Sequence, residues 1–208
     1  DGVLLGSWVS CKKKRILDIG SGTGLISLML AQRNLDCIVT GIEIDQLTFL
    51  ESQLNIKNSD WAKRITIYNV SLQTFSSNVK FDLIVSNPPF FPPNKSKKRR
   101  DVARHTNSLS FEDLIHFSVN LLSKKGVLCI IIPKNFEEYI CDIISKYNLF
   151  YNRGCYVKGT RSSKVKRVLM EFSFASSTFK KEHLVIENSR HEYTDEYIQL
   201  CQQFYLNM

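Results

Sequence analysis

The sequence predicts an α/β fold with a seven-stranded, mostly parallel sheet, helices on both faces and an antiparallel C-terminal hairpin. Three observations support this prediction. Strand patterns alternate with helical patterns along most of the chain. A glycine-rich loop joins the first strand to the following helix, and two neighbouring strand patterns close the alternating series. We assign residues 1–208 to one domain, because this length suits a single core.

The chain opens with an apolar segment, residues 1–8, which we expect to pack on the domain. The first strand, residues 16–19, then runs into the glycine loop 20–24, and a helix follows over residues 25–32. Such a loop lets the backbone approach a ligand closely. A nicotinamide fingerprint would need a third glycine where Leu25 stands, so the pattern departs from it. It resembles motif I of S-adenosylmethionine-dependent methyltransferases, which implies a cofactor role for Asp18, Gly20, Gly22 and Gly24.

The second and third strands each end at a polar residue. Glu43 ends the strand 37–43, about twenty residues past the glycine loop, where an acid accepts hydrogen bonds from both ribose hydroxyls. The alternative role is the N-cap of the helix 46–57, which Asp45 could fill equally well. Asn69 follows the strand 65–68. In methyltransferases of this type a polar residue there, in many relatives Asp, meets the cofactor adenine, so we expect Asn69 to bind the cofactor.

The fourth strand, residues 81–86, runs straight into Asn87-Pro88-Pro89-Phe90. The prolines stop the strand and hold the residue before each of them extended. The resulting turn offers two oxygen acceptors and an aromatic ring at a strand's carboxyl end, where open α/β sheets bind ligands. It resembles the [Asn/Asp/Ser]-Pro-Pro-[Tyr/Phe/Trp] signature of methyltransferases that act on amino or amide nitrogens; the alternative is a simple strand-terminating turn. The expected catalytic residues are Asn87, Pro88, Pro89 and Phe90, with Asn87 also at the cofactor.

The remaining elements complete the alternation. Ser110 and Asp113 predict a capping box that opens a helix to residue 122. A strand over residues 127–132 and a helix over residues 136–147 come next, and residues 150–158 and 165–175 form the hairpin. Thr194 is the expected N-cap of a last short helix.

The net charge of +8 is concentrated in two clusters. Residues 95–104 hold six cations against one acid, and residues 158–167 hold five cations and no acid. Both could be solvated surfaces, but together they favour a face that binds a polyanion, with RNA preferred over DNA. The residues expected to contact RNA are Lys95, Lys97, Lys98, Arg99, Arg100, Arg104, Arg161, Lys164, Lys166 and Arg167.

Other features of the sequence indicate the cellular compartment and whether the chain binds a metal or crosses a membrane. Six cysteines lack any Cys-x-x-Cys pair, so we expect free thiols in a reducing cytoplasm. The four histidines lack metal-ligand spacing, so no metal site is expected. No apolar run approaches a membrane span, and no signal peptide is visible. The chain opens at Asp1 rather than Met, so we expect a missing upstream segment; a monomer is the expected state.

Five segments point to a closer relationship: the opening Asp-Gly-Val-Leu-Leu-Gly-Ser-Trp, the turn 87–91, the loop 103–105 and the endings 193–197 and 204–206. On these segments, nearly the whole chain resembles the bacterial tRNA1(Val) adenine-N6 methyltransferase family. This resemblance implies the class I, Rossmann-like methyltransferase fold, S-adenosylmethionine as cofactor, and methylation of the adenine at position 37 of a valine tRNA. The family's usual Thr before the opening Asp-Gly is absent here.

Three alternatives stay open at this point. Protein glutamine-N5 methyltransferases typically carry Asn-Pro-Pro-Tyr and an added N-terminal helical domain, whereas this chain has Phe90. Guanine-N2 ribosomal RNA methyltransferases carry Asn-Pro-Pro-Phe, usually in a longer, duplicated chain. A catalytically silent RNA-binding protein on the same scaffold is the third, and the intact Asp18, Glu43 and Asn87 count against it.

Overall fold

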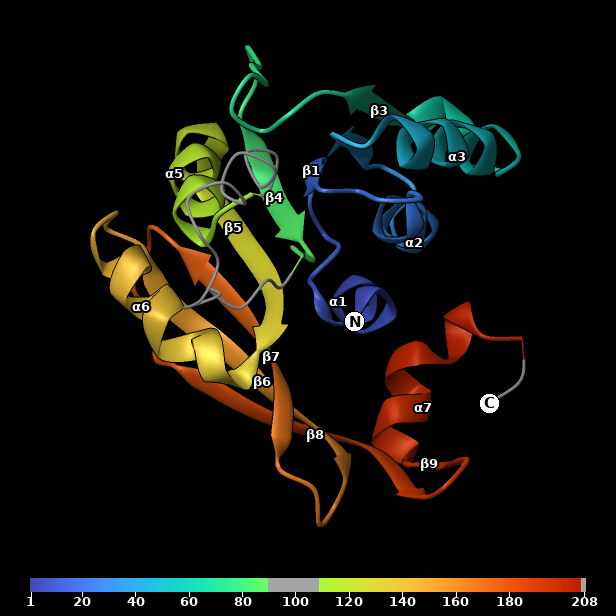
Figure 1. The fold of residues 1–208 in the computed structure, drawn as a ribbon, viewed down its shortest axis with the longest axis vertical. Helices are drawn as coiled ribbons and strands as arrows, with labels where there is room; N and C mark the ends of the chain where they lie inside the picture. The colour runs from blue at the N-terminus through green and yellow to red at the C-terminus, as the bar shows by residue number, and fades with distance from the viewer. Residues whose placement is uncertain (90–108, 207–208) are drawn as a thin grey trace, which may run out of the picture.

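The computed structural model describes residues 1–89 and 109–206. The described residues form one nine-stranded sheet in the order β3-β2-β1-β4-β5-β7-β6-β8-β9 (Figure 1). Its parallel part contains β1 (Arg15–Ile19), β2 (Ile38–Glu43), β3 (Ile65–Asn69), β4 (Phe81–Ser86) and β5 (Leu122–Pro133). The chain builds outward from β1 to β3, then crosses back to place β4 on the other side of β1. This reversal is a topological switch point, where sheets of this kind bind ligands.

The predicted antiparallel hairpin is confirmed. It consists of β6 (Phe150–Thr160) and β7 (Val165–Ser173), and β7 also pairs antiparallel with β5. The sheet nevertheless has two strands more than predicted. β8 (Lys180–Ser189) pairs parallel with β6, and β9 (Glu192–Tyr193) pairs antiparallel with β8. Within β8 only Leu184 is buried, so this charged strand near the sheet edge lacks the apolar alternation that would have predicted it.

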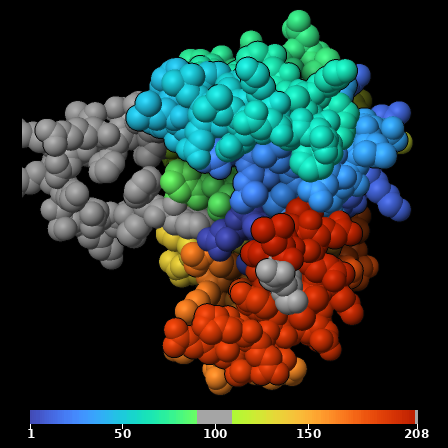
Figure 2. All heavy atoms as spheres, turned by 90° about the vertical axis from the view of Figure 1, so that its right-hand side faces the viewer, coloured from blue at the N-terminus to red at the C-terminus, as the bar shows by residue number. Residues whose placement is uncertain are grey.

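Helices cover both faces of the sheet, as predicted. The first face carries α1 (Gly2–Trp8), α2 (Leu25–Arg33), α3 (Gln46–Lys57) and α7 (Asp195–Cys201), and the second carries α5 (Phe111–Leu121) and α6 (Glu137–Ser145). Short 3-10 turns lie at η1 (Ala62–Arg64), η2 (Lys134–Phe136) and η3 (Gln202–Phe204). In Figure 2, the N-terminal third in blue and cyan and the C-terminal residues in red form one continuous surface.

Burial follows from the alternation of side chains along the strands. In β4, Leu83 and Val85 pack into the core under α1 and α2, while Ile84 packs into the core under α5 and α6. A parallel sheet covered on both faces needs such continuous apolar strands. The opening segment forms α1, and its buried Leu4, Leu5 and Trp8 confirm that it packs on the domain.

Side-chain caps fix the helix starts that the sequence indicates. The hydroxyl of Ser110 accepts the backbone N–H of Asp113 at 3.0 Å, and that of Thr194 accepts the N–H of Tyr197 at 3.2 Å. These bonds satisfy N–H groups that a helix leaves unpaired at its first turn. None of the helices in the described part of the chain is long and apolar enough to cross a membrane.

Candidate active site

A cavity of about 460 Å³ opens at the carboxyl ends of β1, β2 and β4. Gly20 after β1, Glu43 at the end of β2, and the turn 87–89 after β4 all line it. The switch point of the sheet therefore brings both sequence motifs to one space. The other lining residues are Asp1, Ile19, Ile42, Ile44, Thr48, Val70, Ser71, Leu72, Gln73 and Leu109.

The glycine loop presents bare backbone. Gly20 and Gly22 have φ values of +68° and +56°, in the left-handed region that side chains rarely adopt. The carbonyl of Ile42 accepts the N–H groups of both Gly20 and Ser21 at 3.0 Å, which ties the loop to β2. A Cβ added at Gly20 or Gly22 would meet no atom within 4 Å. The loop thus leaves open space that a bound group could fill.

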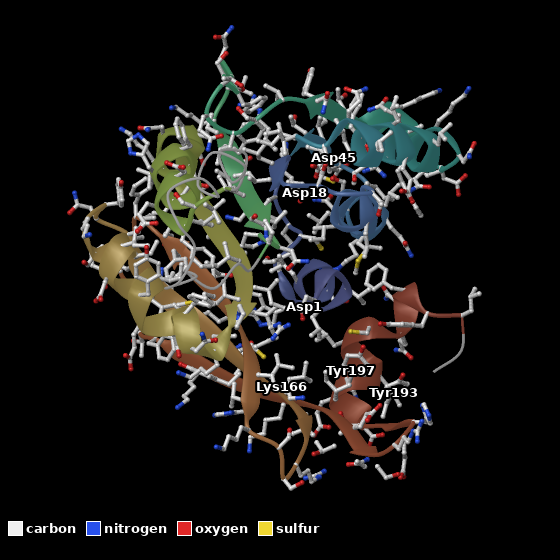
Figure 3. All side chains as sticks on the ribbon, viewed as in Figure 1. Asp1, Asp18, Asp45, Lys166, Tyr193 and Tyr197 are labelled. Carbon is white, nitrogen blue, oxygen red and sulfur yellow. The ribbon has the colours of Figure 1, made fainter. Side chains whose placement is uncertain are left out.

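The side chain of Glu43 connects the glycine loop to the start of α3 through two hydrogen bonds. Its Oε2 accepts the N–H of Gly22 at 2.9 Å, and its Oε1 accepts the N–H of Asp45 at 2.9 Å. The N-cap of α3 is Asp45, whose carboxylate accepts the N–H of Thr48 at 2.8 Å (Figure 3). The alternative role proposed for Glu43 therefore belongs to its neighbour. A carboxylate oxygen accepts more than one hydrogen bond, so Glu43 keeps acceptor capacity toward the cavity.

Asp18 lies beneath the loop and is fully buried. Its Oδ2 accepts the hydroxyl of Ser27 at 2.7 Å, whereas its Oδ1 has no hydrogen-bond partner among the described residues. Burial raises the pKa of Asp18 to about 6, although the hydrogen bonds from Ser27 act in the opposite direction. The hydroxyl of Ser21 is also buried without a partner in this part of the structure. Unpaired buried acceptors indicate a place where a donor fits.

Asn69 lies at the end of β3 but does not line the cavity. Its side-chain amide donates to the carbonyl oxygens of Glu43 at 2.8 Å and Ile44 at 3.2 Å, so it joins the ends of β2 and β3. Contact between Asn69 and an adenine ring stays a prediction. Residues 70–73, directly after it, do line the cavity. Sequence reasoning missed them, although their place at a strand's carboxyl end was an available signal.

The Asn-Pro-Pro turn is anchored through the residue before it. Ser86 is buried, and its hydroxyl donates to the carbonyl of Ile19 at 2.8 Å, which holds the end of β4 against the end of β1. The amide of Asn87 thereby stands at a defined place on the cavity wall. Several predicted residues lie outside the described part of the chain, namely Phe90, Lys95, Lys97, Lys98, Arg99, Arg100 and Arg104.

The second basic cluster lies on the β6–β7 hairpin. Arg161 and Lys164 belong to its turn, and Lys166 and Arg167 begin β7. Arg167 Nε donates to the Asp1 carboxylate at 2.8 Å, so this arginine is paired with a residue of the cavity wall. Among the described residues, no group of three or more His, Cys, Asp or Glu side chains could hold a metal ion.

Comparison with known proteins adds independent findings. Residues 2–156 match the family model described as methyltransferase small domain. The whole chain is 42% identical to the tRNA1(Val) (adenine(37)-N6)-methyltransferase of Christiangramia forsetii, of which it covers 90%. It is 41% identical to the protein of the same name from Flavobacterium psychrophilum, of which it covers 92%. The corresponding protein of Pseudoalteromonas translucida is 35% identical, with 90% of its length covered.

Solved structures share the fold. A predicted O-methyltransferase from Agrobacterium tumefaciens superposes with a TM-score of 0.77 at 18% identity, covering 97% of this chain and 95% of the other. A glycopeptide N-methyltransferase in complex with S-adenosylmethionine gives a TM-score of 0.62 at 10% identity, covering 84% and 95%. These likenesses confirm the predicted α/β methyltransferase fold.

Proposed function

The chain belongs to the tRNA1(Val) (adenine(37)-N6)-methyltransferase family, and from this premise we propose that its substrate is a valine tRNA. As a member of this family it is an S-adenosylmethionine-dependent enzyme that methylates the adenine at position 37 of tRNA. The names of the relatives support the choice of valine tRNA, and the cavity that the glycine loop, Glu43 and the Asn-Pro-Pro turn line together supports methyl transfer. The relatives reported above carry the adenine-N6 name, which disfavours the glutamine and guanine alternatives.

The residues around the glycine loop fit S-adenosylmethionine. Glu43 would accept hydrogen bonds from the ribose hydroxyls, and the bare backbone at Gly20 and Gly22 would allow close approach. The unpaired Oδ1 of Asp18 offers a buried acceptor beneath the same loop. When bound, the cofactor supplies an electrophilic methyl group on a sulfonium.

The Asn-Pro-Pro turn would prepare the amine that receives the methyl group. The lone pair of an adenine N6 is conjugated into the ring, so the amine is a poor nucleophile. The side-chain oxygen of Asn87 and the carbonyl of Pro88 would accept its two hydrogens and favour a pyramidal nitrogen whose lone pair faces the methyl group. Catalysis then consists of positioning and electrostatics, and no strong general base is needed because the proton leaves after transfer.

The basic residues would hold the tRNA. Lysines and arginines of the hairpin would contact phosphates around the target base, and the predicted contacts of residues 95–104 would add to them. The adenine must leave its stack to enter the cavity, and a loop base needs little energy to do so. We infer one domain acting as a monomer in the cytoplasm, where bacterial tRNA is found.

The proposal is tested by methyl transfer from labelled S-adenosylmethionine to unmodified valine tRNA, followed by nucleoside analysis. A second transcript with guanine in place of the adenine at position 37 is the matched control. Other tRNAs with adenine at position 37, DNA, ribosomal RNA and a release factor are assayed in parallel. We expect N6-methyladenosine in valine tRNA and no label in the control. Equal label in every tRNA would overturn the valine specificity, and label in protein or DNA would overturn the substrate class.

A further inference from the structure

A second groove lies past the end of β5, at the base of the β6–β7 hairpin, with a cavity volume of about 520 Å³. Its wall contains three cationic side chains and one amide against a single acid. The lining residues are Pro133, Lys134, Asn135, Glu138, Val165, Lys166 and Arg167. Lys134 and Arg167 are paired with Glu137 and Asp1, which do not line the groove, whereas Lys166 forms no ion pair with a carboxylate of the described residues. The charge of Lys166 is therefore the one most readily offered to an anion.

The groove adjoins the active-site cavity. Arg167 lines the groove, Asp1 lines the cavity, and the two side chains form an ion pair with an N–O distance of 2.8 Å. This ion pair links a residue of one wall to a residue of the other. A strand of RNA whose base enters the cavity would have its neighbouring backbone beside the groove.

Strand register places the groove on the same edge of the sheet as the Asn-Pro-Pro turn. The last residue of β5, Pro133, pairs with Arg167, so the hairpin turn before Arg167 extends beyond the end of β5. Because β5 runs parallel to β4, the end of β5 and the turn after β4 face the same side. The hairpin thus projects past the edge at which the base would bind.

One of the groove's cations is held in place before any ligand binds. Lys134 Nζ lies 2.6 Å from a carboxylate oxygen of Glu137, and the hydroxyl of Tyr156 donates to Glu137 at 2.6 Å. The positive surface continues past the groove, because Lys181 Nζ lies 5.0 Å from the centre of the Tyr156 ring. A fixed cation loses little side-chain freedom on binding a ligand.

We propose that Lys134, Asn135, Lys166 and Arg167 form a phosphate-binding subsite for the RNA strand next to the methylated base. The proposal rests on the proposed function, because it takes RNA as the substrate. The lysines and Arg167 provide charge for phosphate oxygens, and the Asn135 amide provides an N–H donor. Contacts of this kind fix the position of the strand without reading its bases. Binding through the groove is therefore sensitive to salt.

Lys166→Gln is the sharpest test. Lys166 is exposed, and within the described residues its side chain has no hydrogen bond or ion pair, so the variant folds normally. The matched control is Lys63→Gln, because Lys63 is also exposed but lies in η1, before the amino end of β3. The affinity of each protein for valine tRNA is measured by fluorescence anisotropy over a range of salt concentrations. The KM for tRNA and the Kd for S-adenosylmethionine are measured alongside.

Losing one phosphate contact lowers the slope of log affinity against log salt by about 1. We expect this change, with a raised KM for tRNA, in Lys166→Gln alone, while the Kd for S-adenosylmethionine and the kcat at saturating tRNA stay unchanged. Ethylation of one phosphate near the target base should weaken binding of the wild type but not of Lys166→Gln.

The outcomes separate this proposal from the proposed function. A wild-type salt slope in Lys166→Gln, beside a wild type that methylates tRNA, would overturn the subsite alone. An equal loss in Lys63→Gln would indicate diffuse attraction to the whole surface and would also overturn it. A wild type that binds tRNA through Lys166 but transfers no methyl group would support the subsite and overturn the proposed function.

Discussion

The carboxylate of Glu43 accepts a hydrogen bond from the backbone N–H of Gly22 at 2.9 Å. The acid at the end of β2 therefore braces the glycine loop that follows β1, and its other oxygen accepts the N–H of Asp45 at 2.9 Å. Because both oxygens are already held, the carboxylate stands in the cavity wall with little freedom to reorganise when a ligand donates to it.

Glu43→Gln should weaken the binding of S-adenosylmethionine. The amide replaces one acceptor oxygen by an NH₂ group, which then faces a backbone N–H of Gly22 or Asp45. Loss of a charged acceptor costs about 1.5–3 kcal/mol, or roughly a 10- to 100-fold rise in Kd. Isothermal titration calorimetry measures the Kd. Glu51→Gln is the control, because Glu51 is exposed on α3; equal Kd values for the two variants would contradict the role of Glu43.

Gly20→Ala should impair cofactor binding more than folding. Its φ of +68° costs an alanine about 1 kcal/mol, but the new Cβ would meet no protein atom within 4 Å. The methyl group would instead occupy the open space beside the glycine loop. Thermal unfolding without cofactor should thus show a small loss, while the rise in Tm on adding S-adenosylmethionine should largely disappear.

Gly159→Ala serves as the control for this experiment. Gly159 lies in β6, and an added Cβ there would meet only Ser163 Oγ, at 3.8 Å. The control should keep the full rise in Tm on adding the cofactor. A full cofactor response in Gly20→Ala as well would mean that the bound group does not approach the glycine loop.

Local signals explain how much of the fold was predictable. The bounds of α3, Gln46–Lys57, agree with the prediction, and the N-cap acid Asp45 defines the start of this helix locally. β8 was missed because its position depends on a parallel pairing with β6, which no local pattern encodes, and only Leu184 in it is buried. Periodicity detects strands that bury a face, and this strand buries little.

The candidate site also contains residues that the sequence predicts and residues that it does not. The glycine loop and the Asn-Pro-Pro turn were visible because each needs particular residue types for backbone reasons. Residues 70–73 have no such requirement; their place after the carboxyl end of β3 is the one signal in the sequence, and the sheet order brings them to the cavity. The amide of Asn69 was ambiguous, because an amide at a strand end suits a ligand or a neighbouring backbone equally well. Here it donates to the carbonyls of Glu43 and Ile44.

Asn87→Ala should lose most of the methyl-transfer rate while the protein stays folded. The side-chain oxygen of Asn87 would act on the amine as it develops positive charge, and removing one such group costs about 10²- to 10³-fold in kcat. Single-turnover transfer at saturating tRNA and cofactor measures the chemical step. Asn87→Asp keeps an acceptor oxygen, so it should retain more activity than Asn87→Ala. Equal rates in the two variants would contradict the role of the Asn87 side-chain oxygen as an acceptor.

Asp18 should make the stability of the cofactor-free protein depend on pH. Burial raises its pKa from 3.8 to about 6. A carboxyl group with a higher pKa in the folded state favours folding when it is protonated. Its contribution is thus complete below about pH 4 and is lost as the pH rises through about 6. The shift corresponds to roughly 3 kcal/mol.

Urea unfolding of the wild type and Asp18→Asn between pH 4 and pH 7 measures this effect. The free energy of unfolding of Asp18→Asn, relative to the wild type, should increase as the pH rises. Ser27→Ala offers a second check, because the Ser27 hydroxyl donates to Asp18 and opposes the rise in pKa. In that variant the pH-dependent loss should extend to higher pH. A difference between wild type and Asp18→Asn that is constant with pH would contradict the burial argument.

Arg153 joins α1 to the C-terminal strands. Its guanidinium lies 3.8 Å from the centre of the Trp8 ring and forms an ion pair with Glu171 at 2.9 Å. The indole N–H of Trp8 donates to Glu182 at 2.7 Å. Arg153→Met should lower the free energy of unfolding by about 3 kcal/mol, since it leaves a largely buried carboxylate without its partner.

The double variant Arg153→Met/Glu171→Gln separates charge from packing. If the unpaired charge of Glu171 causes the loss, neutralising it should restore part of the stability, and a double-mutant cycle in urea gives the coupling energy.

Loss of the Arg153 contacts should also affect the active site, because α1 begins beside Asp1, a residue of the cavity wall. Arg153→Met should therefore weaken cofactor binding under conditions where it is still fully folded. Additive effects with unchanged cofactor affinity would mean that the Arg153–Glu171 ion pair does not hold α1 in place.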